Sequence, residues 1–187
     1  MRKKMIPRGI LLDSDVLSHF IASGRQRLLK DILAGHQLIM LDQVYSEASF
    51  CPWDSSRKHL LDSMMADCGI VRMNFPSDVT TSVVEEFFRL ASENKRLGRG
   101  ERACMAVARF YRDAIASSNY RDVAPYCEAN GIEYIGFLDI LIIGINKGVI
   151  NEDIAQGILD AAVLANNARF PVNDIRAYTP TKDLGDF

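Results

Sequence analysis

Short apolar runs alternate with longer segments of helical periodicity along most of this chain. The short runs occupy residues 9–12, 37–41, 70–73, 114–116 and 132–135. Between them, segments such as 79–93 and 101–111 place apolar residues at the three- and four-residue spacing of a helix with one buried face. Strands that alternate with helices pair in parallel, because each helix returns the chain to the same end of the sheet. The sequence therefore predicts an α/β fold with a parallel sheet.

The remaining helices are expected at residues 16–21, 27–33, 42–48, 56–65, 121–130, 138–146 and 151–165. Pro125 fits a helix only in its first turn, because proline has no N–H to donate, so the helix around it is expected to begin after residue 121. Phe87 and Phe88 are expected in the core. An exposed part of helix 79–93 is the alternative, as a surface for a second copy or another protein.

Length and composition indicate one ordinary globular domain. The chain has 187 residues, of which 48% are hydrophobic and 25% charged, enough to bury a substantial core. The net charge of −2 argues against a protein that coats nucleic acid without specificity, because such domains are usually basic. It is compatible with an enzyme that holds a few nucleotides.

Nothing in the chain resembles a secretory or membrane segment. The basic start at residues 1–8 leads into an apolar run that Asp13 interrupts, whereas a signal peptide needs roughly 7–15 apolar residues in succession. The apolar stretch 132–145 contains Glu133 and Asp139, so it does not read as a membrane span. We therefore expect a cytoplasmic protein without membrane contact.

The cysteines and histidines show no metal-ligand spacing. No CxxC pair is present, so buried free thiols are expected at Cys51, Cys68, Cys104 and Cys127. Surface or helix-end positions are expected for His19, His36 and His59.

Oxygen-bearing side chains stand at or near the predicted element boundaries, where they can point into a cleft. They are Asp13, Glu47, Glu101, Asn119 and Asp122. Carboxylates that gather in space repel one another, and a hard divalent cation such as Mg²⁺ or Mn²⁺ neutralises them with the oxygen ligands it prefers. Such a site suits phosphodiester cleavage, in which metal ions activate water and stabilise the leaving oxygen.

Each of these residues also has a plain structural explanation. Asp13 could cap a helix, although Asp15 is the better-placed cap and Asp13 the better site candidate. Glu101 gains from the helix dipole in a first turn, and the same holds for Asp122. Glu47 could be a solvated helix residue, and Asn119 could be a turn residue.

Arginines flank Glu101. Arg99 and Arg102 are either solvated loop residues or contacts to a phosphate beside the metal, since guanidinium groups suit phosphate geometry. We favour the phosphate contact and therefore an RNA-binding role.

Five sequence blocks resemble, in order, those of the PIN-domain family of metal-dependent ribonucleases, which includes VapC-like toxin nucleases. The blocks read GILLDSDVLSHFI, LIMLDQVYSEAS, LGRGERACMAVAR, SSNYRDV and NGIEYIGFLDIL. In the fourth block Ser118, Asn119 and Asp122 match the family pattern. The likeness covers about residues 9–145 of a single domain 1–187, and the helix and tail at about 150–187 are additions to it.

The resemblance implies a PIN-like α/β/α sandwich with a central, mainly parallel sheet, whose site lies at the carboxyl ends of the strands. It implies that Asp13, Glu101, Asn119 and Asp122 ligate a Mg²⁺ or Mn²⁺ ion. Glu47 would also ligate metal or would position the attacking water. It implies an endoribonuclease acting on RNA. Because many family members are toxins paired with an antitoxin, and many are homodimers, an antitoxin and a second copy are the partners it suggests.

Two departures from the family pattern keep other functions open. Tyr120 stands where many members carry the first Asp of the fourth block, and Phe137 replaces a common Thr or Ser. A degenerate site would leave a PIN-like RNA- or protein-binding module without catalysis. The segment LLDSDVL also resembles the opening of haloacid-dehalogenase-type phosphatases, in which Asp13 would be the nucleophile, although Leu17 departs from that pattern.

Overall fold

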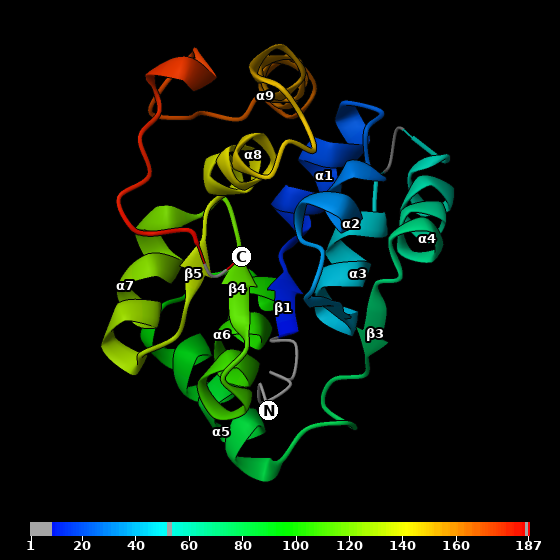
Figure 1. Ribbon diagram of the computed structural model, residues 1–187. Coiled ribbons are helices and arrows are strands. Elements are labelled where there is room, and N and C mark those ends of the chain that lie inside the picture. Colours follow the sequence, from blue (N-terminus) through cyan, green and yellow to red (C-terminus); the bar gives the residue numbers. More distant parts are fainter. Residues whose placement is uncertain (1–8, 52–53, 186) are drawn as a thin grey trace, which may run out of the picture.

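A computed structural model describes residues 9–51, 54–185 and 187 of the chain, so the basic start at residues 1–8 lies outside the described part. Its centre is an all-parallel sheet in the order β3-β2-β1-β4-β5. The strands are β1 (Gly9–Leu12), β2 (Gln37–Leu41), β3 (Val71–Met73), β4 (Ala114–Ala116) and β5 (Tyr134–Ile135). Helices flank this sheet (Figure 1). The predicted α/β class and the parallel sheet are confirmed.

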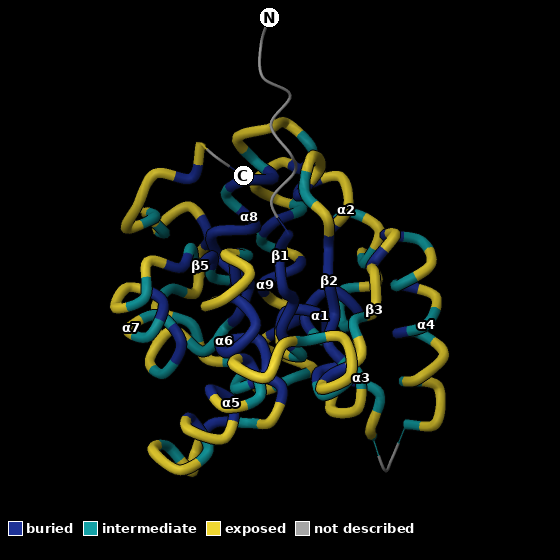
Figure 2. Tube along the Cα trace, turned by 90° about the horizontal axis from the view of Figure 1, so that it is seen from below, coloured by how far each residue is buried: buried dark blue, intermediate teal, exposed yellow. Residues whose placement is uncertain are grey.

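The helices follow the strands in the alternation that the sequence predicts. They are α1 (Ser14–Ala22), α2 (Leu28–Ile32), α3 (Asp42–Ser49), α4 (Arg57–Cys68), α5 (Thr81–Glu93), α6 (Arg99–Tyr111), α7 (Tyr120–Asn130), α8 (Phe137–Asn146) and α9 (Glu152–Asn166), followed by the short 3₁₀ helix η1 (Ile175–Ala177). Figure 1 shows α5, α6 and α7 on one side of the strands and α1 to α4 on the other. The strands β1, β2, β4 and β5 form the buried centre, whereas the edge strand β3 is largely exposed, and α4, α5 and α7 carry exposed residues (Figure 2).

The order in which strands are added to the sheet reverses between β1 and β4. The chain builds β1, β2 and β3 outward on one side, then crosses to add β4 and β5 on the other. Leu12 pairs with Ala116, so the residues that follow these two strands leave the sheet side by side. Ligands of open α/β sheets bind at such a switch point, beyond the carboxyl ends of the strands.

Two local predictions are wrong. Helix α7 begins at Tyr120, so Pro125 lies inside the helix rather than in its first turn. Pro125 therefore cannot donate to the Arg121 carbonyl four residues earlier, while the Asn119 side chain caps the helix start by accepting from the Asp122 N–H. Phe88 is not a core residue but is 64% exposed, whereas Phe87 is buried, because adjacent helical residues point in different directions.

The late helix α9 belongs to the core of the domain. It packs against α1 and α8, and its buried face is formed by Ala155, Ile158, Leu159 and Ala162. Burying each of the larger side chains stabilises the fold by about 1.5–3 kcal/mol. In the described part of the chain, no helix has the length and apolar character that crossing a membrane requires.

His19 lies inside the protein, which corrects the expected surface or helix-end position. Only 3% of its surface is exposed, because α9 covers the face of α1 that carries it. Its ring packs edge-on against Phe137 and Phe170, and its Nδ1 lies 3.0 Å from Asn166 Nδ2. Burial, with a smaller effect of the Arg57 charge, lowers the pKa of His19 to about 4.

Acid should therefore destabilise the fold through His19. In the unfolded chain His19 is protonated below its ordinary pKa of 6.5, whereas in the folded protein it is protonated only below about pH 4. The free energy of unfolding is therefore highest above pH 6.5 and falls as the pH drops from 6.5 to about 4. The loss is about 3 kcal/mol at most. Urea unfolding across this range should show a steeper loss for the wild type than for His19→Leu, and equal losses would contradict the assignment.

Candidate active site

Asp13 leaves β1 at the switch point and lies almost wholly buried, with 2% of its surface exposed. Both of its carboxylate oxygens accept hydrogen bonds. Oδ1 accepts from the Ser14 backbone N–H at 2.8 Å, and Oδ2 accepts from the Ser117 hydroxyl at 2.7 Å. Asp13 is thus the N-cap of α1. The expectation that Asp15 is the better cap is wrong, because the helix begins two residues earlier than predicted.

The surroundings of Asp13 disfavour its negative charge. Burial is the largest cause, the nearby charges of Asp15 and Glu101 add to it, and the bonds from Ser117 and Ser14 oppose it, so that the pKa rises from 3.8 to about 7. A carboxyl group with such a pKa is held in place by the fold at a cost in stability, and positive charge nearby would relieve that cost.

Asp15 belongs to the same cluster, which the sequence reading missed when it gave this residue to the helix cap. It lies at the exposed rim of the site. Partial burial raises the pKa of Asp15, and the charges of Glu101 and Glu47 raise it further. Its position two residues after Asp13 in a first helical turn was the signal, since it projects beyond the same strand end.

Glu101, Asn119 and Asp122 meet in one hydrogen-bonded group. The Asn119 side-chain amide donates to Glu101 Oε1 at 2.6 Å and to Asp122 Oδ2 at 3.2 Å. Its carbonyl oxygen accepts from the Asp122 backbone N–H at 3.3 Å, which caps α7. Glu101 Oε2 accepts from the Gly98 backbone N–H at 2.8 Å, which caps α6. The structure brings together residues that lie on two different helices.

Glu47 reaches the cluster from α3. Its Oε1 accepts from the Gly100 backbone N–H at 3.0 Å, and a methyl group on Gly100 would come within 2.6 Å of Glu47 Oε2. Glycine is needed at this close approach. Glu47 also lines a cavity of about 450 Å³ together with Arg99 and the exposed Phe50.

The two arginines that flank Glu101 differ in their surroundings. Arg99 lines the cavity beside Glu47, where it can meet an anion. Arg102 donates to the Gly98 carbonyl at 3.2 Å and lies over the Phe87 ring, 5.3 Å from its centroid. These contacts stabilise the start of α6, so a structural role already accounts for Arg102.

Ser117 is the other functional residue that sequence reasoning missed. It is buried, with 1% of its surface exposed, and it fixes Asp13 through its hydroxyl. The Asp13 backbone N–H also donates to the Ala116 carbonyl at 2.9 Å. Only the strand order puts Ser117 beside Asp13, and that order cannot be read from the apolar runs alone.

The acidic side chains share one electrostatic environment without forming a finished metal site. Burial raises the pKa of the Cys104 thiol, and the charges of Asp13, Glu47 and Glu101 raise it further. Within the described residues, no three His, Cys, Asp or Glu side chains are placed so that they could hold a metal ion as they stand. Glu47 and Glu101 instead accept backbone N–H groups.

Comparisons with known proteins give no match, either to a protein-family model, to a curated protein or to a solved structure.

Replacing the Asp13 carboxyl group with a neutral amide should stabilise the metal-free protein. The folded pKa lies near 7 and the ordinary value is 3.8, so ionisation weakens the fold as pH rises between them. Asp13→Asn removes this penalty, which is about 4 kcal/mol at most above pH 7 and vanishes near pH 4.

Urea unfolding in EDTA should therefore give a stabilised Asp13→Asn variant at about pH 8 and a wild-type-like one at about pH 4.5. Glu85→Gln, an exposed change on α5, is the control. A variant that is equally destabilised at both pH values would show that the amide cannot replace the hydrogen bonds of Asp13.

Proposed function

We propose that the protein is a PIN-like, Mg²⁺- or Mn²⁺-dependent endoribonuclease that hydrolyses RNA phosphodiester bonds. One observation carries the proposal: a buried carboxylate, Asp13, at the switch point of the sheet, with the charges of Asp15 and Glu101 raising its pKa. The ordered sequence blocks support it independently.

The donor set fits a hard divalent cation. Its members offer carboxylate and amide oxygens, the ligands such cations take, and Asp13 is the rigid member because two hydrogen bonds orient it. Asp13, Glu101 and Asp122 would hold the ion, with Asn119 turning its carbonyl oxygen toward it. Glu101 and Asn119 would exchange their present hydrogen bonds for metal contacts.

When bound, the cation would activate water and stabilise the departing oxygen of the phosphodiester. The protein's own part is to position and orient. Glu47, fixed by the Gly100 N–H, would ligate metal or accept a hydrogen bond from the attacking water. Arg99, beside Glu47 and in the same cavity, would contact a phosphate of the RNA.

The burial of Asp13 weighs against the phosphatase alternative. A nucleophilic carboxylate must reach the phosphorus of its substrate with a free oxygen. Both Asp13 oxygens are occupied by hydrogen bonds, and the residue is almost wholly buried. Each oxygen keeps a second lone pair that a small cation could take, whereas a phosphoryl group with its substituents would need open access to this buried residue.

An antitoxin or a second copy of the chain is proposed on the resemblance alone. The exposed Phe88 on α5 is an apolar side chain that such a partner would cover.

The decisive experiment is cleavage of a pool of single-stranded and structured RNA, with Mn²⁺ and with EDTA. We expect the wild type and Glu85→Gln to cut only with metal, and Asp13→Asn to remain at the EDTA background because it loses the anchoring charge. The variant's unfolding curve shows whether it is folded.

Cleavage that survives Asp13→Asn would refute the mechanism. If the wild type also fails to cleave RNA under all metal conditions, the alternative of an RNA- or protein-binding module without catalysis is favoured instead.

Gly100→Ala offers a second test of Glu47. The new methyl group forces the Glu47 carboxylate to move, whereas a methyl group on Gly98 stays at least 3.5 Å from its neighbours. We expect Gly100→Ala to slow Mn²⁺-dependent cleavage several-fold while Gly98→Ala stays near wild type. The free energy of unfolding should change little, because the greater helix propensity of alanine over glycine, about 1 kcal/mol, offsets the cost of moving the Glu47 side chain. Equal rates in the two variants would remove Glu47 from the site.

A further inference from the structure

A second, larger cavity opens beside the acidic cluster on the side of β5. Its volume is about 750 Å³, within the range of small-molecule sites. Its walls come from the start of α7, the turn from β5 into α8, and the chain after α9 at residues 169–182. Figure 1 shows this last segment descending from α9 past β5 and α7. Part of the wall is therefore built by the segment outside the family-like core.

The cavity walls combine aromatic rings with charged side chains of both signs. The rings of Tyr134, Phe137, Phe170 and Tyr178 line it, and Phe170 stacks on Phe137 with 5.3 Å between centroids. Tyr120 stands at its mouth, 64% exposed, with its ring 6.0 Å from that of Tyr134. An exposed aromatic face over an apolar floor is the surface on which an unpaired base stacks.

Three cations line the same cavity. Arg121 and Arg169 make no ion pair within the described residues, and Lys182 lies 5.9 Å from the centroid of the Tyr134 ring. Three acids, Glu128, Glu133 and Asp139, line the cavity as well. Of these, Asp139 accepts from the Gly136 N–H and the Tyr178 hydroxyl. Ser118 also lines the cavity, and its hydroxyl is buried without a hydrogen-bond partner in the described part of the chain.

The cavity is joined to the acidic cluster through a chain of hydrogen bonds. The Tyr134 hydroxyl donates to the Ser117 carbonyl at 2.6 Å, and the Ser117 hydroxyl donates to Asp13. Asn119 lines the cavity and bonds to Glu101. A ligand in the cavity would therefore place the part that extends beyond the cavity against the carboxylates.

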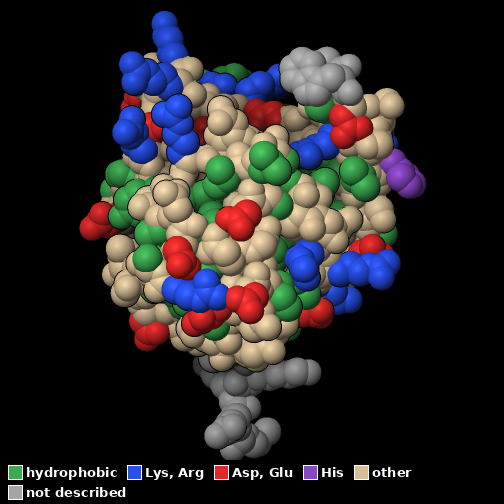
Figure 3. All heavy atoms as spheres, turned by 90° about the horizontal axis from the view of Figure 1, so that it is seen from above, with side chains coloured by type: hydrophobic (Ala, Val, Ile, Leu, Met, Phe, Trp, Pro, Cys, Tyr) green, Lys and Arg blue, Asp and Glu red, His purple; other side chains and the backbone are tan. Residues whose placement is uncertain are grey.

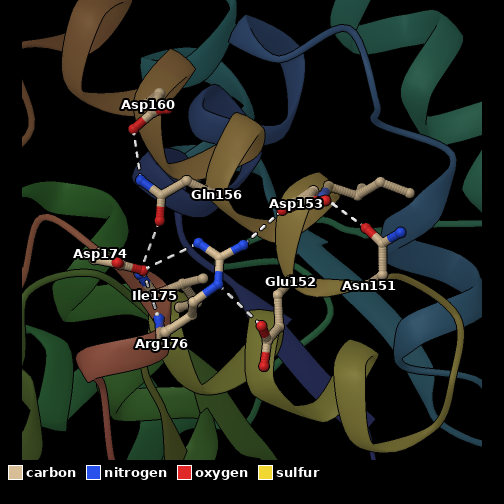
Figure 4. A network of polar contacts seen from close by, with 9 residues as sticks. Asn151, Glu152, Asp153, Gln156, Asp160, Asp174, Ile175 and Arg176 are labelled. Carbon is tan, nitrogen blue, oxygen red and sulfur yellow. Dashed lines mark hydrogen bonds and ion pairs between the residues drawn. The ribbon is translucent and has the colours of Figure 1, made fainter.

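The outer wall is fixed in position by a polar network at the start of α9. Arg176 pairs with Glu152 at 3.0 Å and with Asp153 at 2.5 Å (Figure 4). Gln156 accepts from the Ile175 N–H at 2.8 Å and donates to the Asn173 carbonyl at 2.9 Å. Viewed from above, this face carries side chains of both charges, with Lys and Arg gathered at one edge (Figure 3).

We propose that this cavity binds one unpaired nucleobase of the RNA, stacked on Tyr120, with Arg169 and Arg121 near the adjoining phosphate. The inference rests on the proposed function, because it places the base next to the bond that is cut. It assigns the C-terminal segment a role in substrate binding.

The test is binding of the four nucleoside 5′-monophosphates in EDTA, where no cleavage can occur, by ligand-observed NMR. Ribose 5-phosphate is the probe without a base. We expect at least one nucleotide to bind about tenfold more tightly than ribose 5-phosphate, and Tyr120→Ala to remove about tenfold in affinity. Tyr111→Ala, which removes an exposed tyrosine from the end of α6, should bind like the wild type.

Equal binding of nucleotides and ribose 5-phosphate would reduce the cavity to an anion site and overturn the proposal. Equal effects of Tyr120→Ala and Tyr111→Ala would overturn it as well, and so would an absence of nucleotide binding at millimolar concentration, which would leave the cavity to a protein side chain. Metal-dependent cleavage without base binding would refute this inference alone. Base binding without cleavage would uphold it and refute catalysis.

Discussion

The burial of the Asp13 carboxylate among other acids is the constraint around which this end of the molecule is organised. The fold holds it by two hydrogen bonds, from Ser14 at the start of α1 and from Ser117 directly after β4, and these bonds offset only part of the burial cost. A structural residue would gain nothing from this arrangement, because serine or asparagine could cap α1 without the charge. Retaining a carboxylate where its charge is disfavoured is typical of a functional site.

The other members of the cluster serve the fold at the same time. Glu101 caps α6, Asn119 caps α7, and Glu47 accepts the Gly100 N–H. These bonds hold the side chains near the strand ends and also satisfy the helix starts that deliver them. A structural explanation and a functional one therefore apply to the same atoms, and removal of one side chain will disturb both. Matched substitutions that separate stability from chemistry are needed for this reason.

The sequence predicts the strands and most helices because apolar runs and helical periodicity are local signals. It also predicts that oxygen-bearing side chains stand at strand ends, and the structure brings Glu101, Asn119 and Asp122 into contact. It does not predict Ser117 beside Asp13, because strand order is a long-range property of the chain. The burial of His19 likewise depends on where α9 packs, which the periodicity of α1 cannot reveal.

Tyr120 and Phe137, the two departures from the PIN-like pattern, line the same cavity. Taken one at a time, each suggests a weakened site, since an aromatic ring replaces an oxygen donor. Taken together, they put aromatic surface along one side of the acids, where Phe137 stacks on Phe170 of the added C-terminal segment. Tyr120, Phe137 and the C-terminal segment thus line the same cavity. In the proposed nuclease, a wall of rings next to the carboxylates would change what the site can hold, while the carboxylates that would perform the chemistry are in place.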